Sequence, residues 1–467
     1  MINKTKIICT IGPASSGVKI LSSLIKKGMD VVRLNFSHGD RETHLEYINN
    51  VRTASKRTNV FIPIMQDLQG PKIRVGSLEN KFIRLISGKR IIITDKNIIG
   101  NENRISTTYK HFVKDVKKGE YILMDDGLLR MRIISKSANE VECVVLKGGI
   151  LKEHKGINLP DTRLSLPSLT AKDKEDLLFG LKHNIDAVAL SFVRKADDII
   201  QLRNLITKYG KSVPIVAKIE RPEAIENIDE IIDAVDVIMV ARGDMGVEIS
   251  PEDVPILQKI IIKKCNEKNK PVITATQMLE SMTNSRIPTR AEATDVANSI
   301  LDGTDCVMLS GETSVGVDPE NVVQTMEKII RRIENYRKPL LNLSHPPESE
   351  LHSLCKSAIT LANEIKAKAI VTYSVTGNSP KYLSSYRVNT EIICITENRM
   401  INVLNHFRWG VFSLKITKSM SDTDVTKLLL NTLSISRIIK SKDKIVILMS
   451  SGKSMYKSAD TIRIKVK

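Results

Sequence analysis

The chain has 467 residues, of which 42% are hydrophobic and 4% aromatic, so it is long enough for several domains with aliphatic cores. Its net charge is +18, but the Lys and Arg residues are spread along the chain without a basic tract, which argues against a nucleic-acid partner. No apolar run reaches the roughly 18 residues of a membrane span, so we expect no membrane partner. Six cysteines without a CxxC pair favour the reducing cytoplasm.

The predicted elements begin with a repeated unit, in which a short β-branched run ends in polar residues and is mostly followed by a helical stretch. Such runs suit parallel strands that are buried on both faces. Repeated eight times, with one insertion, the unit predicts an α/β fold of the closed (β/α)8 TIM-barrel type, and a doubly wound open sheet is the alternative. The runs are Lys6–Ile11, Val31–Phe36, Phe61–Asp67, Ala187–Phe192, Pro214–Glu220, Val237–Arg242, Pro271–Thr276 and Cys306–Ser310.

The barrel is predicted to occupy residues 1–70 and 168–342, interrupted by residues 71–167. In this insertion short alternating runs are separated by Gly, Asn and Asp turns, which predicts a small all-β domain. Charged, Pro-containing sequence from Tyr336 to Glu350 predicts a linker, and strands alternating with helical stretches over residues 343–467 predict a smaller α/β domain. A helix start is predicted at Ser250, a capping residue that precedes Pro251.

Polar side chains follow most of the barrel strands, at the edge where barrel active sites form. Lys218 and Glu220 are two residues apart and therefore share a face, and Asp244 follows the next strand. Two carboxylates on neighbouring strands suit Mg²⁺, which takes one or two protein carboxylates. With Arg33 and Arg74 opposite, Lys218 completes a cationic clamp of the kind that phosphoryl transfer needs. Each feature alone fits a structural ion pair or turn, but their convergence favours a site.

These segments together resemble pyruvate kinase. The motifs occur in the order and spacing of that family, and the similarity runs through nearly the whole chain. The matching stretches are Lys6–Ser15, Gly28–Gly39, Asp67–Val75, Val216–Glu220, Met239–Ile249, Val272–Met282, Thr289–Glu292 and Asp302–Glu312.

The resemblance implies an enzyme that transfers the phosphoryl group of phosphoenolpyruvate to ADP, giving pyruvate and ATP in the last step of glycolysis. Arg33 would bind the substrate phosphate, and Lys218 would neutralise charge on the phosphoryl group and on the enolate oxygen. Glu220 and Asp244 would hold Mg²⁺, for which Mn²⁺ can substitute.

The resemblance also assigns the groups around the substrate and the nucleotide. Backbone N–H groups around Gly243 and Asp244 would take the substrate carboxylate, and Thr276 would join a proton relay near the enolate carbon. The inserted domain would be a lid that closes on the phosphates and excludes water. The nucleotide-facing residues would be Asn35, Phe36, Ser37, His38, Arg74 and Lys155.

One position departs from the pattern of K⁺-requiring members of the family. Those enzymes hold K⁺ through residues that match Asn35, Ser37, Asp67 and the carbonyl of Leu68, with a glutamate where this chain has Lys72. The Lys72 ammonium can supply the missing charge internally. We therefore expect an enzyme that is largely independent of K⁺.

The C-terminal part resembles the regulatory domain of the family. A loop opens a helix after a predicted strand, where N–H groups and hydroxyls suit a phosphate, with an ordinary capped helix start as the alternative. The resemblance thus suggests a sugar-phosphate or AMP effector, and family members are usually homotetramers. The effector residues would be Ser374, Thr376, Gly377, Asn378 and Ser379, of which Asn378 is atypical.

Two other functions fit parts of the pattern. A Mg²⁺-dependent barrel lyase or aldolase that works through a pyruvate enolate would need the carboxylate pair, but not the inserted domain with Arg74 and Lys155. A catalytically dead relative kept as a sugar-phosphate sensor would need a broken site. None of the predicted catalytic and metal-binding residues is missing from this chain.

Overall fold

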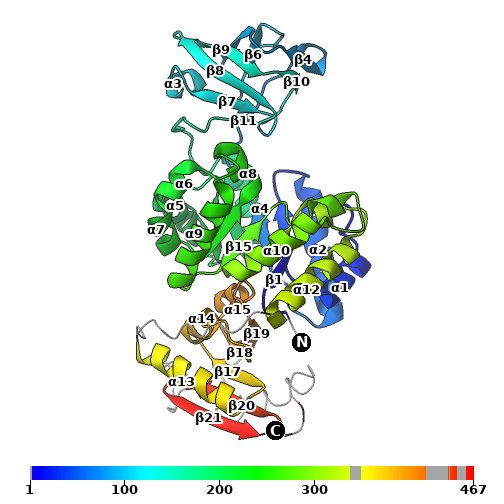
Figure 1. Cartoon of the computed structure of the whole chain (residues 1–467), viewed down its shortest axis with the longest axis vertical. Helices are drawn as coiled ribbons and strands as arrows, with labels where there is room; N and C mark the ends of the chain where they lie inside the picture. Colours follow the sequence, from blue (N-terminus) through cyan, green and yellow to red (C-terminus); the bar gives the residue numbers. More distant parts are fainter. Residues whose placement is uncertain (1–2, 337–348, 417–439, 441, 450–458, 467) are drawn as a thin grey trace.

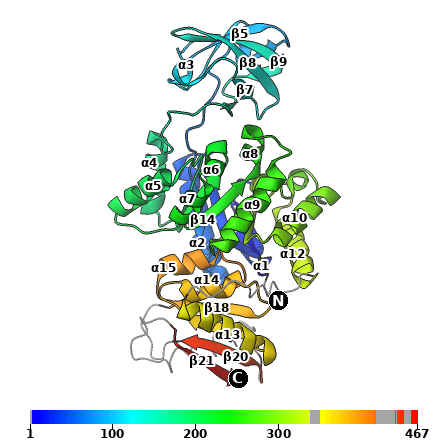
Figure 2. The same ribbon diagram turned by 60° about the vertical axis from the view of Figure 1, so that its left-hand side comes forward.

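The computed structural model describes residues 3–336, 349–416, 440, 442–449 and 459–466, which are arranged in three tiers (Figure 1). The inserted β domain lies at one end, the barrel in the middle and the C-terminal domain at the other end. The same order holds in the view turned by 60° (Figure 2).

The middle tier is a closed barrel of parallel strands in the order β1-β16-β15-β14-β13-β12-β3-β2, so the prediction of a barrel is confirmed and the open sheet is wrong. Nearly every residue of these strands is buried, because side chains pack both inside the barrel and against the surrounding helices. The strands are β1 (Lys6–Thr10), β2 (Met29–Asn35), β3 (Ile64–Asp67), β12 (Ala187–Leu190), β13 (Ile215–Ile219), β14 (Val237–Ala241), β15 (Val272–Ala275) and β16 (Cys306–Leu309).

Helices cover the outside of the barrel, and several begin at side-chain caps. Thr289 and Glu292 form a capping box at the start of α10. The predicted helix start at Ser250 is wrong: α9 begins at Val254, because the residues before it form a turn. The barrel helices are α1 (Val18–Lys26), α2 (Arg41–Thr58), α4 (Ala171–Lys182), α5 (Ala196–Lys208), α6 (Pro222–Glu226), α7 (Ile228–Ala234), α8 (Arg242–Glu248), α9 (Val254–Glu267), α10 (Arg290–Asp302), α11 (Gly311–Ser314) and α12 (Pro319–Tyr336).

The inserted domain has its own hydrophobic core, separate from that of the barrel. A six-stranded sheet, β11-β7-β8-β9-β5-β6, packs with the pair β10-β4, as the alternating sequence predicted. Its elements are β4 (Phe82–Leu85), β5 (Arg90–Thr94), β6 (Arg104–Ser106), α3 (Phe112–Asp115), β7 (Tyr121–Met124), β8 (Leu129–Lys136), β9 (Glu140–Lys147), β10 (Gly149–Lys152) and β11 (Ile157–Asn158).

The C-terminal domain contains a five-stranded sheet in the order β19-β18-β17-β20-β21. The predicted linker and the predicted helical stretch after β19 lie almost wholly outside the described residues. The described elements are α13 (Glu350–Glu364), β17 (Ala369–Tyr373), α14 (Asn378–Ser385), β18 (Glu391–Thr396), α15 (Arg399–Asn405), β19 (Val411–Lys415), β20 (Lys444–Met449) and β21 (Thr461–Val466).

The C-terminal domain also closes the floor of the barrel. Phe407, which follows α15, is fully buried in one hydrophobic cluster with residues from the barrel interior, such as Ile8 and Met308. The thiol of Cys306 donates a hydrogen bond to the carbonyl of Phe407 at 3.3 Å. The innermost layer of the barrel is therefore completed by the domain below it.

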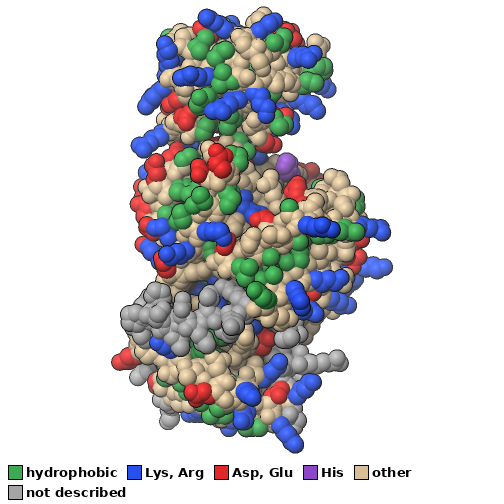
Figure 3. Space-filling view, in the orientation of Figure 1, with side chains coloured by type: hydrophobic (Ala, Val, Ile, Leu, Met, Phe, Trp, Pro, Cys, Tyr) green, Lys and Arg blue, Asp and Glu red, His purple; other side chains and the backbone are tan. Residues whose placement is uncertain are grey.

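The surface carries its positive charge diffusely. On the face shown in Figure 3, Lys and Arg side chains lie over all three tiers and do not gather into one patch. Among the described residues, no helix combines the length and apolar character that crossing a membrane would require.

Candidate active site

Lys218 ends β13 in the mouth of the barrel and is held by three side chains. Its ammonium donates to Ser191 Oγ at 2.7 Å and lies 2.9 Å from Glu220 Oε1 and 3.4 Å from Asp67 Oδ1. Burial by itself lowers the pKa of Lys218, but the carboxylates of Asp67 and Glu220 outweigh burial and raise that pKa above its ordinary value. Lys218 therefore stays positively charged at neutral pH.

Arg33 on β2 is paired with Asp67 on the neighbouring strand β3. Nε and Nη2 of Arg33 lie 2.8 and 2.7 Å from Asp67 Oδ2, and Nη1 donates to Thr10 Oγ1 at 3.0 Å. Burial raises the pKa of Asp67, yet the charges of Lys218 and Arg33 reverse this effect and hold the pKa below its usual range. Asp67 thus remains ionised and orients both predicted catalytic cations.

The charge of Asp244 acts on the carboxylate of Glu220. Burial, first among the causes, and the charge of Asp244 raise the pKa of Glu220 to about 7, although the charge of Lys218 lowers it. Glu220 Oε2 accepts the N–H of Phe192 at 2.8 Å, while the buried Oε1 faces the Lys218 ammonium at 2.9 Å and has no other partner among the described residues. A divalent cation beside the two carboxylates would lower the pKa of Glu220, because its charge favours the ionised form.

The donor set therefore fits Mg²⁺. Within the described residues no cluster of three or more His, Cys, Asp or Glu side chains has the geometry of a metal site. Mg²⁺ does not need such a cluster, because one or two protein carboxylates bind it and water molecules and substrate oxygens complete its coordination.

Thr276, after β15, has a φ of +67°, a conformation that β-branched residues rarely adopt. Its hydroxyl accepts the N–H of Gly243 at 2.7 Å and donates to the Ala275 carbonyl at 2.6 Å. Arg242 Nη2 donates to the Thr276 carbonyl at 2.7 Å, which holds the strained backbone. The Gly243 N–H predicted for the substrate carboxylate is thus engaged by a hydroxyl of the next strand.

Only some of the predicted nucleotide-facing residues lie close to one another. Burial comes first among the causes that lower the pKa of His38, and the charges of Lys72 and Arg74 come next, so these cations lie near His38. Arg74 also donates to the carbonyl of His154 in the inserted domain at 3.0 Å. Lys155 pairs with Asp125 at 2.7 Å within that domain.

The side chain of Phe36, in the stretch predicted to face the nucleotide, is directed into the core. It is only 2% exposed and stacks on His44, with ring centroids 3.9 Å apart. The segment alternates its side chains between the core and the mouth, so Phe36 points inward to the core while its neighbours Asn35 and Ser37 stay partly exposed.

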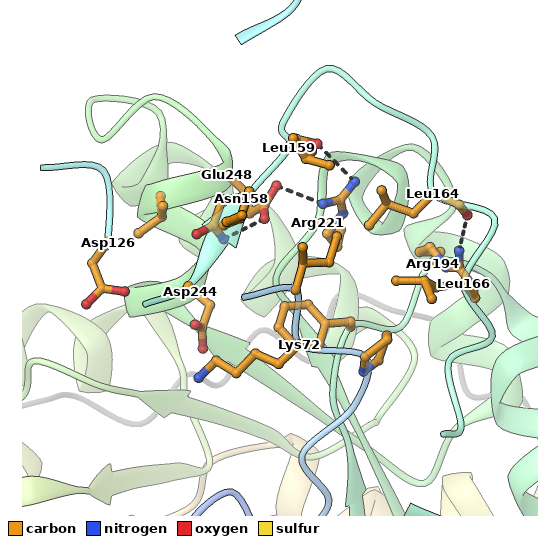
Figure 4. A pocket seen from close by; sticks show the side chains of 16 residues that line it. Lys72, Asp126, Asn158, Leu159, Leu164, Leu166, Arg194, Arg221, Asp244 and Glu248 are labelled. Atoms are coloured by element: carbon orange, nitrogen blue, oxygen red, sulfur yellow. Dashed lines mark hydrogen bonds and ion pairs between the residues drawn. The ribbon is translucent and has the colours of Figure 1, made fainter. Parts of the chain in front are cut away.

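Three of the four groups predicted for a monovalent cation already have partners within the protein. Asn35 Oδ1 accepts the N–H of Ser37 at 3.2 Å, and the Leu68 carbonyl accepts the Ser191 hydroxyl at 2.7 Å. Both oxygens of the Asp67 carboxylate face protein cations. Lys72 does not enter this group: Figure 4 shows its amine end directed toward Asp244.

A pocket opens where the stems of the inserted domain meet the barrel mouth (Figure 4), and Lys72 and Asp244 line it. Arg221 Nη1 lies 2.9 Å from Glu248 Oε2, and Glu248 Oε1 accepts the Asn158 amide at 2.8 Å. Arg221 also donates to the Thr162 carbonyl at 3.0 Å. These bonds tie the returning stem of the inserted domain to the helices that follow β13 and β14.

Comparison with known proteins decides the family. The family model described as the pyruvate kinase barrel domain matches residues 2–323, and the model of the pyruvate kinase alpha/beta domain matches residues 352–465. The chain belongs to the pyruvate kinase family.

Proteins named pyruvate kinase align with this chain over most of their length. Pyruvate kinase from Geobacillus stearothermophilus is 42% identical over 473 aligned residues, which cover 100% of this chain and 80% of the relative. Pyruvate kinase from Staphylococcus aureus (strain MRSA252) is 42% identical over 429 residues, 91% of this chain and 73% of the relative. The crystal structure of a pyruvate kinase from Cryptosporidium parvum superposes with a TM-score of 0.93 at 38% identity, covering 99% and 96% of the two chains.

These findings support the predicted function. The chain is a phosphotransferase that uses phosphoenolpyruvate and ADP, and its family needs a divalent metal. Neither the lyase or aldolase nor the dead sensor finds support among the relatives.

Sequence reasoning missed several residues of the pyruvate kinase site. Ser191 touches Lys218 and could have been found, because it ends a barrel strand as the predicted residues do. No sequence pattern indicated Arg221 and Glu248, because their ion pair and the bond of Arg221 to Thr162 join segments that lie far apart in the chain.

The predicted effector loop forms a tight turn before α14. Gly377 adopts a φ of +82° and donates its N–H to Ser374 Oγ at 3.0 Å. Ser374 and Ser379 are buried, whereas Thr376 and Asn378 are exposed. No side chain of a described residue caps the start of α14.

Proposed function

We propose that phosphoryl transfer takes place beside Lys218, with Arg33 binding the substrate phosphate. The observation that carries this proposal is the buried contact of Lys218 with two carboxylates at the mouth of a closed barrel. The fixed charge of Lys218 would neutralise the oxygens of the phosphoryl group in transfer and then the enolate oxygen left behind. Asp67 keeps both cations in place through the transfer.

Glu220 and Asp244 would hold the divalent ion, which we propose is Mg²⁺, with Mn²⁺ as a substitute. When bound, the ion supplies positive charge for the substrate oxygens. The charge of Asp244 raises the pKa of Glu220, so the two carboxylates lie near each other, which supports this assignment. Phe192 donates its N–H to the second oxygen of Glu220 and thereby fixes the carboxylate.

Thr276 and Gly243 would position the three-carbon substrate. The N–H groups around Gly243 and Asp244 would bind its carboxylate, and the Thr276 hydroxyl would pass a proton toward the enolate carbon. The hydroxyl accepts the N–H of Gly243 and donates to the Ala275 carbonyl, and it would exchange that carbonyl for the substrate in order to pass a proton.

We place the nucleotide between the barrel mouth and the inserted domain, near Asn35, Ser37 and His38. The domain limits stay as proposed from the sequence, 1–70, 71–167, 168–342 and 343–467, with residues 71–167 as the lid. Arg74 and Lys155 would approach the nucleotide when the lid closes, which would also exclude water.

We further propose that the enzyme is largely independent of K⁺. The support is that Asp67, a predicted K⁺ ligand, already faces the charged groups of Arg33 and Lys218. Lys72 adds a further positive charge near the mouth.

Three finer proposals concern the rest of the molecule. A sugar phosphate or AMP would bind as an effector at Ser374, Thr376, Gly377, Asn378 and Ser379, and the assembly would be a homotetramer. The six cysteines are all buried free thiols, which supports a reducing compartment such as the cytoplasm.

A coupled assay of the purified protein tests the central proposal. We expect pyruvate formation that requires phosphoenolpyruvate, ADP and Mg²⁺ and that changes by less than about twofold when K⁺ and Na⁺ are omitted. Absence of turnover would refute the activity. A many-fold activation by K⁺ would leave the activity standing and refute the independence from K⁺.

A further inference from the structure

A second polar hollow lies on the opposite side of the barrel, between its floor and the C-terminal domain. It is a small hollow that opens to solvent on one side. The barrel contributes the end of α9 and the starts of β15 and β16, and the C-terminal domain contributes the end of α14 and the residues before β19.

Four cations line this hollow with a single carboxylate: Lys270, Lys381, Arg387 and Arg408 against Asp305. That carboxylate is already committed, because Asp305 Oδ1 lies 2.9 Å from Arg387 Nη1 and also accepts the N–H of Trp409. The second oxygen accepts the N–H of Val272 at 3.0 Å. The lining therefore carries an excess of positive charge.

Arg408 is the unusual member of this group. The residue is only 8% exposed, and its Nε is buried without a hydrogen-bond acceptor in the described part of the structure. No ion pair joins its guanidinium to a described residue, although the charges of Asp305 and Asp236 act on it. Burial lowers the pKa of Arg408 to about 10, so the group still carries its charge at neutral pH. A buried guanidinium whose Nε lacks an acceptor is costly, and an anion would satisfy it.

We propose that this floor pocket binds a phosphate group, either as inorganic phosphate or as a compact phosphomonoester, held by Arg408, Lys381 and Lys270. A guanidinium offers two parallel N–H donors that match two phosphate oxygens. The two lysines add point charges from either side: Lys270, whose ammonium also donates to the carbonyls of Asp233 and Val235, from the barrel, and Lys381 from the C-terminal domain.

The bound anion would join the two domains. Ser384, at the end of α14, lines the same pocket. Helix α14 begins at the loop proposed for an effector and ends at this pocket, so the two phosphate sites would lie at opposite ends of one helix. The floor pocket is thus separate from both that loop and the catalytic mouth.

Trp409 provides a direct readout, because it is the only tryptophan of the chain. Its ring is buried beside Arg387, with the guanidinium carbon 5.3 Å from the ring centroid, and the backbone N–H of Trp409 donates to Asp305. We suggest titrating the full-length protein with inorganic phosphate, and separately with glycerol 3-phosphate, without divalent metal and at constant ionic strength, while recording Trp409 fluorescence.

We expect a saturable change that Arg408→Gln abolishes and that Lys381→Gln weakens by about tenfold. Lys368→Gln, an exposed lysine of the same domain outside the pocket, is the matched control and should leave the curve unchanged. Lys218→Met and Thr376→Ala, at the mouth and in the effector loop, should also respond as the wild type does. The tighter of the two ligands identifies the source of the phosphate group.

The proposal is overturned if the wild type shows no saturable response, or if the response survives both Arg408→Gln and Lys381→Gln. Loss of the response in Lys218→Met or Thr376→Ala alone would assign the binding to those other sites and would also overturn it. Lys381 is only partly buried, so Lys381→Gln keeps the test valid even if Arg408→Gln does not fold.

Discussion

The mouth and the floor of the barrel both gather buried cations, but they balance them differently. At the mouth, Lys218 and Arg33 share the carboxylate of Asp67, and Lys218 also faces Glu220. On the floor, Arg387 uses the single carboxylate of Asp305, and Arg408 has no acidic partner among the described residues.

This difference shows two ways to prepare a site for an anion. Paired cations are held rigidly in the absence of substrate, which suits a transition state that tolerates little misplacement. An unpaired buried cation raises the free energy of the empty site, and a bound anion lowers it again, which suits binding and not chemistry. The variants below test each half of this comparison, in order of expected effect.

Lys218→Met should have the largest effect. Removing the fixed charge beside the transferred phosphoryl group should lower kcat by about 10³-fold or more. Mn²⁺ affinity, measured by titration calorimetry, should stay within about tenfold, because Glu220 and Asp244 remain. Lys182→Met, an exposed lysine on α4, is the control. Near-normal turnover of Lys218→Met would mean that the mouth does not work through this charge.

Glu220→Gln should weaken Mn²⁺ binding by about a hundredfold, because it keeps the shape of the side chain but removes one of two metal-binding carboxylates. The same calorimetric titration measures this change. Glu226→Gln changes an exposed glutamate on the next helix and should leave the affinity unaltered. Unchanged binding in Glu220→Gln would contradict the assignment of the metal to this pair.

Asp305→Asn should destabilise the floor, because Arg387 would lose the carboxylate with which it pairs. We expect the free energy of unfolding to fall by about 3 kcal/mol, the usual cost of an uncompensated buried charge. Urea unfolding followed by Trp409 fluorescence measures this loss, and added phosphate should restore part of it. If phosphate does not raise the stability of Asp305→Asn, the cations of the floor do not bind an anion, and the proposed difference between floor and mouth is contradicted.

Lys72→Glu should have the smallest effect on the mouth. The substitution places a glutamate where K⁺-requiring enzymes of the family have one, and it should make turnover rise several-fold with added K⁺. The coupled assay with and without K⁺ is the measurement, and Lys89→Glu in the exposed inserted domain is a control of equal charge change. A K⁺ response equal to that of the wild type would show that Lys72 does not replace the ion.

Much of the fold followed from the sequence, because buried parallel strands and alternating β strands leave clear periodic patterns. The ends of those strands also indicated Lys218, Glu220 and Asp244, since all eight strands deliver their last residues to one rim. Phe36 could not be placed, because the resemblance covers a whole stretch while a strand sends neighbouring side chains to opposite faces.

The floor pocket gave no sequence signal at all. Its cations come from segments far apart in the chain, and each one looks like an ordinary surface lysine or arginine until the domains meet. The same holds for Arg221, whose bonds to the stem of the inserted domain depend on tertiary contacts. Sequence patterns report local periodicity and strand ends, not which distant side chains share a cavity.

The late position of Phe407 in the chain affects how the barrel folds during synthesis. The barrel strands leave the ribosome well before this residue, which lies 101 positions beyond Cys306, its partner in the lowest layer. Until Phe407 arrives, the nascent barrel has an apolar opening at its base, and such transient openings are where growing chains aggregate or meet chaperones. The C-terminal domain, which is synthesised last, therefore closes the base of a barrel that is built from earlier parts of the chain.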